Sequence, residues 1–168
     1  MELLGVWSLR RVLLAGNSCV MQRAMEDALC ALGARVSHAA NPLDEEMLSH
    51  LLHKGRCACV IVPDLLALHT SAQGRLSSLN MLLSESREAG LPLAMLLAGG
   101  KGGETAQLFS QAQGWACGAS GDPVSLQCIR HWSDDPDYAC LHALTLGARY
   151  LSGDHTCTGY FDLSKGTR

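Results

Sequence analysis

Residues 11–32 read RVLLAGNSCVMQRAMEDALCAL, and this stretch decides the fold. Residues 12–15 form a short continuous apolar run, which is typical of a strand buried on both faces. Gly16 interrupts the run, and apolar residues then recur at helical spacing as far as Leu32. The pattern predicts a buried strand, a tight turn and an amphipathic helix.

Gly33 follows this helix and suits its end, because glycine adopts the left-handed conformation without steric cost. A second apolar run begins at Ala34, and such a β-turn-α-β unit opens an α/β sheet. Apolar runs then alternate with helical patterns along the chain. We therefore predict a single α/β domain over residues 1–168, a three-layer Rossmann-like fold with a mostly parallel sheet and helices on both faces. The further strands are expected at residues 57–62, 91–98, 124–132 and 152–161, and the further helices after Asn41, at 71–89, at 104–115 and after Asp134, with an N-terminal extension at 1–9 and a flexible tail at 163–168.

The turn after the first strand is where a dinucleotide-binding domain carries glycines, which let the backbone approach a pyrophosphate. Gly16, Asn17, Ser18 and Cys19 form this turn and are the candidate cofactor contacts. Only Gly16 matches a glycine of that pattern, while Cys19 and Gln22 stand where spacing variants of it need glycine. Because their side chains would crowd a pyrophosphate, we predict weak NAD(P) binding or none.

The composition excludes several classes of function. Hydrophobic residues make up 48% of the chain and charged residues 17%, which predicts that some apolar surface is buried against a partner. The net charge of −3, without a basic stripe, disfavours nucleic-acid binding. No apolar run has the length of a membrane span, and the N-terminus lacks a signal-peptide pattern. We expect a cytoplasmic protein that binds no membrane.

The eight cysteines lie in apolar runs or on helix faces, which predicts free, mostly buried thiols. Cys57 and Cys59 would face the same side of a strand, with His50 and His53 upstream, but no second ligand pair has usable zinc spacing. We therefore predict no metal site. Cys19, at a helix N-terminus, is either a thiol activated by the helix dipole or a small residue facing the strand ends.

Three stretches together resemble the short-chain dehydrogenase/reductase superfamily over about half of the chain. Residues 12–32 match its first β-turn-α unit. Residues 41–47, NPLDEEM, are similar to its D-V-T-D-E-E segment and lead to an apolar strand, CVIV. Residues 138–156 are similar to its closing helix and its S-x-Y-I-T-G-Q turn. The resemblance implies an NAD(P)-binding Rossmann fold and the reduction of carbonyl groups.

The chain departs from this family where the family's chemistry takes place. PDLL at residues 63–66 replaces N-N-A-G, and Ala98 and Gly99 stand where the family's serine is expected. The family's Tyr-x-x-x-Lys is replaced by Trp115 and Ala119, and tryptophan has no ionisable hydroxyl to act as an acid. No acidic residue follows the second strand to hold a ribose. We predict no catalytic residues.

Two other motifs have both a functional and a structural interpretation. Residues 99–103, GGKGG, with Lys101, would form either an anion-binding nest or a connector. Asp154 and His155, with Tyr160, would form either an acid–base pair or a turn before an edge strand, which explains them better.

These observations favour a degenerate, truncated and catalytically silent member of the superfamily. It would act as a structural or regulatory subunit, in a homo-oligomer or in a hetero-oligomer with an active, full-length reductase. The alternative is an NAD(P)-dependent oxidoreductase of the carbonyl or ketoacyl reductase type with unorthodox catalytic residues. A third class is a flavodoxin-like or receiver-like signalling domain, in which Asp64 would be the phosphoacceptor, but no acidic pair follows the first strand.

The predicted subunit interface lies in residues 138–161, because the family builds its interface from the closing helix and tail. An edge strand at residues 156–160 would pair with a neighbour. The predicted contact residues are Tyr138, Leu141, Leu144, Tyr150, Thr156 and Tyr160.

Overall fold

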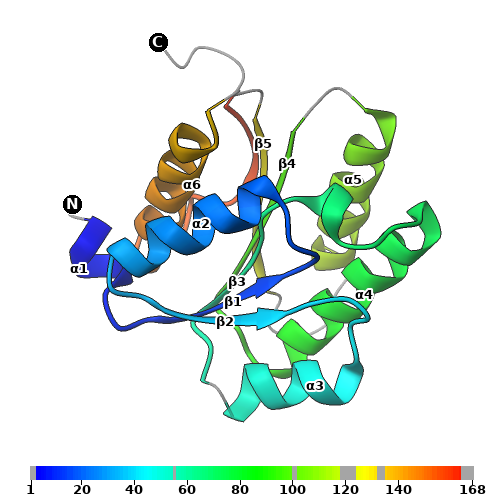
Figure 1. The fold of residues 1–168 in the computed structure, drawn as a ribbon, viewed down its shortest axis with the longest axis horizontal. Helices are drawn as coiled ribbons and strands as arrows, with labels where there is room; N and C mark the ends of the chain where they lie inside the picture. Colours follow the sequence, from blue (N-terminus) through cyan, green and yellow to red (C-terminus); the bar gives the residue numbers. More distant parts are fainter. Residues whose placement is uncertain (1–2, 55, 100–101, 118–123, 132–134, 164–168) are drawn as a thin grey trace.

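Six parallel strands form one sheet in the order β2-β1-β3-β4-β5-β6, with helices on both faces (Figure 1). This arrangement confirms the predicted Rossmann-like α/β fold. The computed structural model describes residues 3–54, 56–99, 102–117, 124–131 and 135–163. The strands are β1 (Arg11–Ala15), β2 (Arg35–Ala39), β3 (Cys59–Val62), β4 (Leu93–Gly99), β5 (Ser125–His131) and β6 (Gly159–Asp162).

The apolar runs of the sequence form the central strands because a parallel sheet covered by helices buries both of its faces. All four residues of β3 are buried, as are six of the seven residues of β4. The edge strands β2 and β6 are more exposed. Continuous hydrophobicity thus marks the centre of the sheet.

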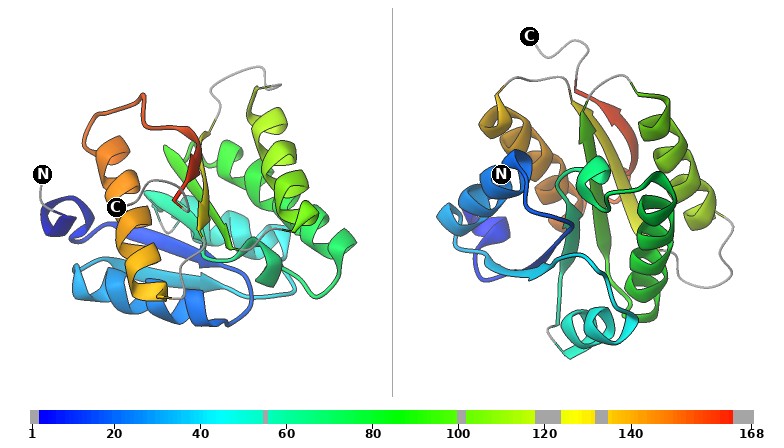
Figure 2. Two further views of the ribbon diagram at one scale, coloured as in Figure 1. Left: turned by 90° about the horizontal axis from the view of Figure 1, so that it is seen from above. Right: turned by 45° about the vertical axis from the view of Figure 1, so that its right-hand side comes forward.

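The helices form one layer on each face of the sheet (Figure 2). Helices α3, α4 and α5 pack on one face, and α1, α2 and α6 pack on the other. Within the described ranges, no helix combines the length and the apolar character that a bilayer span requires. The helical elements are α1 (Leu3–Trp7), α2 (Val20–Ala31), α3 (Glu45–Ser49), a π-helical segment (His50–Lys54), a 3₁₀ turn η2 (Leu65–Ala67), α4 (Ala72–Glu88), α5 (Gly103–Cys117) and α6 (Pro136–Leu151).

The N-terminal segment is part of the core and not a loose extension. Trp7 of α1 is fully buried against α6, and its indole N–H donates to the carbonyl of Leu144 at 3.0 Å. A helix of five residues is too short for its periodicity to reveal this packing.

Helical spacing left some details of the helices open. The helix expected after Asn41 begins at Glu45, and Asp44 caps it by accepting the N–H of Glu46. Leu76 of α4 and Leu141 of α6 lie at the edges of their apolar stripes and are 39% and 52% exposed. Spacing identifies the apolar stripe of a helix, but the neighbouring elements decide whether the residues at the edge of that stripe are buried.

The strand order also predicts where along the sheet a ligand would bind. From β1 the chain passes to β2 on one side and to β3 on the other, so the order reverses between β1 and β3. In open α/β sheets ligands bind at such a point, beyond the carboxyl ends of the strands. The first five strands have the order that flavodoxin-like folds share, and β6 adds a sixth parallel strand beyond it.

Candidate functional site at the carboxyl edge of the sheet

The backbone of the turn between β1 and α2 is hydrogen-bonded to two other segments of the protein. Gly16 has φ +121° and donates its N–H to the carbonyl of Ala39 at 2.9 Å. The next N–H, that of Asn17, donates to the carbonyl of Ala67 in η2 at 2.9 Å. Two N–H groups of this turn are therefore already bonded within the protein.

The turn η2 also packs closely against Gly16. A Cβ atom at residue 16 would lie 3.5 Å from the carbonyl oxygen of Ala67 and 3.7 Å from the Cα of Leu68. In dinucleotide-binding turns, glycine leaves room for the pyrophosphate to approach the backbone. Here protein backbone takes up part of that room.

The first turn of α2 is capped by a cysteine. The Sγ of Cys19 accepts the N–H of Gln22 at 3.4 Å, and Gln22 itself is buried. Burial raises the pKa of the Cys19 thiol, although the bond from Gln22 acts in the opposite direction. Burial thus favours the protonated thiol, which supports the interpretation of Cys19 as a small residue over that of a dipole-activated nucleophile. Cys19 acts as a small capping residue that faces the strand ends.

The structure places all four predicted cofactor contacts together, at the point where the strand order reverses. Gly16 and Asn17 face η2, Cys19 caps α2, and Ser18 between them is exposed. Their location agrees with the sequence analysis. Their predicted weak contact with NAD(P) stays a prediction.

The ends of β3, β4 and β5 carry a second group of residues, of which sequence reasoning missed His131. Asp64 comes two residues after β3, while Gly99 and His131 end β4 and β5 and are paired in register. His131 is only 7% exposed, and neither of its ring nitrogens has a hydrogen-bond partner among the described residues. A histidine that closes a buried strand at the ligand edge was the available sequence signal.

Asp64 and His131 influence each other's ionisation. Burial lowers the pKa of His131, and the charge of Asp64 only partly opposes this effect. Burial raises the pKa of Asp64, against the N–H of Leu66, which donates to its Oδ1 at 3.0 Å, and against His131. The lowered pKa favours the neutral imidazole at neutral pH, and Asp64 is half-buried.

Gly99 provides the room for this imidazole. Its φ lies outside the left-handed region, so conformational freedom does not explain the glycine. A Cβ atom at residue 99 would lie 3.2 Å from Cε1 of His131 and 3.4 Å from its carbonyl oxygen. Only a glycine fits beside the ring without displacing it.

The predicted interface residues on α6 differ in exposure. Tyr138 and Leu141 are 42% and 52% exposed, and Tyr138 packs against the ring of His142. Leu144 is fully buried between α6 and the sheet, so its side chain cannot contact another chain. Its assignment to an interface is corrected to the core, because helical spacing alone does not distinguish a core stripe from a contact stripe.

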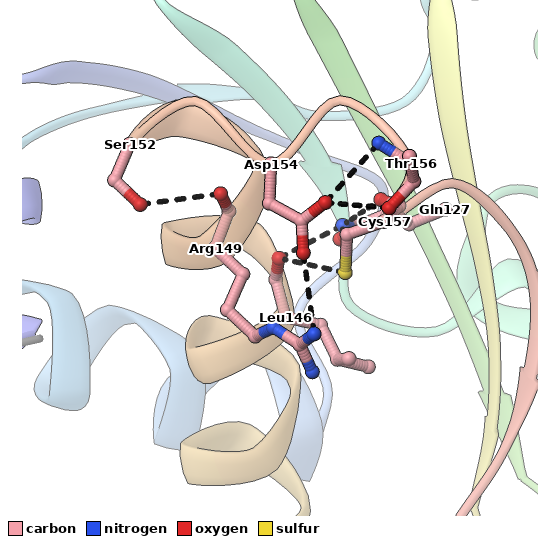
Figure 3. Close-up of polar contacts among 7 residues, drawn as sticks. All are labelled: Gln127, Leu146, Arg149, Ser152, Asp154, Thr156 and Cys157. Carbon is pink, nitrogen blue, oxygen red and sulfur yellow. Dashed lines mark hydrogen bonds and ion pairs between the residues drawn. The ribbon is translucent and has the colours of Figure 1, made fainter.

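The segment that joins α6 to β6 is a turn organised by Asp154 (Figure 3). The carboxylate of Asp154 accepts the N–H and the hydroxyl of Thr156 and pairs with Arg149 at 3.2 Å. These contacts, the Thr156 hydroxyl first, hold the pKa of Asp154 below its ordinary value. Buried Gln127 donates to two backbone carbonyls of the same region (Figure 3). The geometry supports the structural interpretation of this motif.

The remaining interface candidates do not form one surface. The hydroxyl of Tyr150 lies 2.6 Å from that of Ser125, in the layer of α6. Tyr160 packs edge-on against Phe109 of α5, on the opposite face of the sheet, and is 47% exposed. The edge strand is β6, so Thr156 lies in the preceding turn and not in the strand that was expected at residues 156–160.

The seven cysteines whose side chains the structure describes are free. Cys30 is exposed, contrary to the expectation of buried thiols, whereas four others are buried. Cys57 precedes β3 and packs in the layer opposite to that of Cys59, so the two thiols do not share a face as predicted. Among the described residues, no three His, Cys, Asp or Glu side chains are grouped to hold a metal ion. Lys101 lies outside the described residues, so the anion nest stays a prediction.

Comparison with known proteins shows similarity at the level of the fold. No family model and no curated protein matches the chain. Three similar solved structures, all from Campylobacter jejuni, cover 75–79% of this chain, but it spans only about half of theirs, 47–52%. They are a GDP-D-glycero-L-gluco-heptose synthase in the presence of NADPH (TM-score 0.56, 7% identity), a GDP-6-OMe-4-keto-L-xylo-heptose reductase (0.57, 6%) and a GDP-mannoheptose C4 reductase with NADP bound (0.57, 8%).

Proposed function

We propose that this protein is a catalytically silent Rossmann-like subunit, which assembles with a second copy or with an active reductase as a structural or regulatory partner. The observation that carries the proposal is the bond from the N–H of Asn17 to the carbonyl of Ala67. It joins η2 to the turn that would hold a pyrophosphate. A dinucleotide would have to break this bond and displace η2 from Gly16.

The residues at the end of β4 also support a silent protein. Ala98 and Gly99 have no side chain that could hydrogen-bond a carbonyl oxygen of a substrate. A general acid typically supplies about 10²–10⁴-fold in rate. The family's tyrosine and lysine have no counterpart at Trp115 and Ala119.

The partner surface proposed for this subunit is the open edge of β6 with the exposed apolar residues near it. A strand at the end of a sheet presents unpaired backbone groups to a neighbour. Exposed Tyr160 lies on this strand and faces the α5 layer, whereas exposed Tyr138 and Leu141 lie on α6 in the other layer, so a partner would have to reach around the edge of β6 to contact all three. A stable interface there should bury more than about 1,000 Å².

The alternative is an NAD(P)-dependent oxidoreductase with unorthodox catalytic residues. The fold likeness to a reductase with NADP bound favours it. Titration with NADPH and NADH, followed by calorimetry, separates the two. We expect no low-micromolar affinity and no turnover with a panel of ketones. Tight cofactor binding together with ketone reduction would contradict the silent subunit and establish the alternative.

Light scattering tests the assembly. We expect an oligomeric wild type and a shift toward monomers in Leu141→Asp and Tyr160→Asp, because each places a charge in a desolvated contact. Leu76→Asp is the matched control, since Leu76 is an exposed leucine of α4 on the opposite layer. Dissociation by Leu76→Asp alone would move the interface to the α4 side. A monomeric wild type that also fails to bind a coexpressed reductase would contradict the proposal.

A further inference from the structure

We propose that the cleft between α3 and the last turn of α4 binds a small organic ligand with two or more ammonium groups, such as a diamine or a polyamine (Figure 1). The cleft is open to solvent and has a volume of about 630 Å³, which lies in the range of small-molecule sites. The exposed carboxylates of Asp44, Glu45 and Glu46 and the buried carboxylate of Glu85 line it. The cleft lies in the layer opposite to α6, so the proposal does not depend on the subunit role argued above.

The first argument is a buried carboxylate without a positively charged partner. Glu85 of α4 is only 8% exposed, and it lines the cleft. Among the side chains that the structure describes, no lysine or arginine pairs with it, and its hydrogen-bonding contact is another carboxyl group, that of Glu45. Buried carboxylates in proteins are almost always paired. Two carboxylates share a contact favourably only when a proton or a cation lies between them.

The second argument is that local structure does not explain Glu85. Asp44 caps α3, and Glu45 and Glu46 complement the positive end of that helix, so secondary structure accounts for these three acidic residues. Glu85 lies in the last turn of α4, where a negative charge opposes the helix dipole. Burial and then the charge of Glu45 raise the pKa of Glu85, and the charge of His53 only partly opposes them. A carboxylate in this position calls for a bound cationic group.

The π-helical segment His50–Lys54 brings further acceptors to the cleft. Leu52 of this segment is buried in the same layer as Leu82 of α4, so the segment packs beside the helix that carries Glu85. The imidazoles of His50 and His53 both line the cleft. Turns of π-helix are rare in proteins and are frequent at functional sites.

The chemistry of the lining defines the ligand class. Every described side chain that lines the cleft carries a hydrogen-bond acceptor, and none of them is a lysine or an arginine. An ammonium group has three donors and no acceptor and complements this lining, whereas the four carboxylates would repel a phosphate. A single metal ion fits poorly, because no three of the described His, Cys, Asp or Glu side chains are grouped to hold one. Carboxylates that come from two helices favour a ligand with ammonium groups at two points.

The experiment is calorimetric titration of the full chain with spermidine and with putrescine. It is made in about 150 mM sodium chloride, which screens the attraction of distant surface charges. Butanediol is the uncharged counterpart of putrescine, and magnesium, calcium and zinc chlorides are the metal probes. We expect spermidine to bind with a dissociation constant of about 0.1 mM and putrescine to bind more weakly. Butanediol and the metal chlorides should give no saturable heat.

Three variants assign the binding to the cleft. Glu85→Gln and Glu45→Gln keep the shape of the side chain but remove its charge, and we expect each to weaken spermidine binding about tenfold. Asp27→Asn is the matched control, because it removes one negative charge from an exposed position of α2 in the opposite layer. It should change the affinity by less than about twofold. Carbon-13 NMR of the Glu45 and Glu85 carboxyl groups should show that spermidine shifts both resonances.

Each result either supports or overturns the proposal. Weaker binding in both glutamine variants, with the affinity of Asp27→Asn unchanged, supports the site. If circular dichroism shows that Glu85→Gln does not fold, exposed Glu45→Gln decides by the same comparison. The proposal is overturned if spermidine gives no saturable binding, if butanediol binds as well as putrescine, or if only a metal ion binds. Equal affinity in the glutamine variants and the wild type, or an equal loss in Asp27→Asn, also overturns it. None of these results changes the light-scattering test of the subunit role.

Discussion

The two halves of the carboxyl edge of the sheet differ in whether their buried polar groups have hydrogen-bond partners. In the β1–α2 turn, the N–H groups of Gly16 and Asn17 are both bonded to backbone carbonyls of the protein. At the ends of β4 and β5, both ring nitrogens of His131 are buried and have no partner within the part of the chain that the structure describes. The half that holds a nucleotide in dinucleotide-binding folds is a packing contact here, while the other half contains buried polar groups that the described part of the fold does not satisfy.

Because of this difference, we expect mutations in the two halves to change the stability of the fold in opposite directions. Changes in the turn break contacts that stabilise the fold. Removing an unsatisfied buried polar group can instead be neutral or stabilising.

The largest effect is expected for Gly16→Ala. At φ +121° a Cβ atom is strained, and the bonds to Ala39 and Ala67 hold the backbone in place. We expect a loss of about 2 kcal/mol, or roughly 6 °C in melting temperature. The control is Gly153→Ala, which has the same φ of 121° but lies in an exposed turn with open space. If calorimetry shows an equal loss of stability in both variants, the contact of Gly16 with η2 contributes nothing to the stability of the fold.

His131→Leu is expected to change stability in the other direction. Leucine has a similar volume and leaves no ring nitrogen unsatisfied, so we expect a gain of about 1 kcal/mol. Denaturant unfolding measures it, with exposed His155→Leu as a control that should stay within about 0.5 kcal/mol of the wild type. A clear loss of stability in His131→Leu would mean that the imidazole stabilises the fold. Mutations in the two halves would then no longer act in opposite directions.

The same substitution should alter the pH dependence of stability. Burial holds the pKa of folded His131 below its ordinary value of 6.5, so the unfolded chain takes up the proton first. Wild-type stability should therefore fall as pH drops below 6.5 toward the folded pKa, by at most about 1.4 kcal/mol per pH unit from this group. The contribution of this group fades above pH 6.5, where the unfolded chain also loses the proton.

His131→Leu should remove that slope in unfolding experiments over the same pH range. Asp64 acts in the opposite direction at lower pH, because its raised pKa makes the folded state hold a proton longer than the unfolded chain. Asp64→Asn removes the titrating carboxyl group, so the pH dependence of its stability contains the contribution of His131 without that of Asp64. An unchanged slope in His131→Leu would show that another group titrates in this window.

The smallest effect is expected for Cys19→Ser. Serine is a better N-cap than cysteine, whose Sγ accepts the N–H of Gln22 at 3.4 Å, so we expect a gain of about 0.5 kcal/mol. Alkylation followed by mass spectrometry provides a second reading, in which exposed Cys30 should react before Cys19. Faster alkylation of Cys19 would indicate an activated thiol at the turn.

The sequence could predict the fold because local patterns carry it. The apolar runs marked the central strands, and helical spacing marked α2, α4, α5 and α6. It could not predict the exposure of Leu76 and Leu141 or the burial of Leu144, because a helix stripe has the same spacing whether it contacts the core or another chain. Trp7 was missed because five residues carry too little periodicity.

By itself, the sequence determined the β-turn-α-β opening, the mismatch of Cys19 and Gln22 with a glycine-rich turn, and the lack of the serine, tyrosine and lysine that a resemblance to the short-chain dehydrogenases/reductases would imply. These features depend on residue identity and spacing within short segments. Only the tertiary structure decided that η2 bonds to the turn and that Asp64 and His131 act on each other. Asp64 and His131 are far apart in the chain, and parallel pairing of β3, β4 and β5 brings their carboxyl ends to one edge. Such contacts depend on strand order and register, which no local pattern specifies.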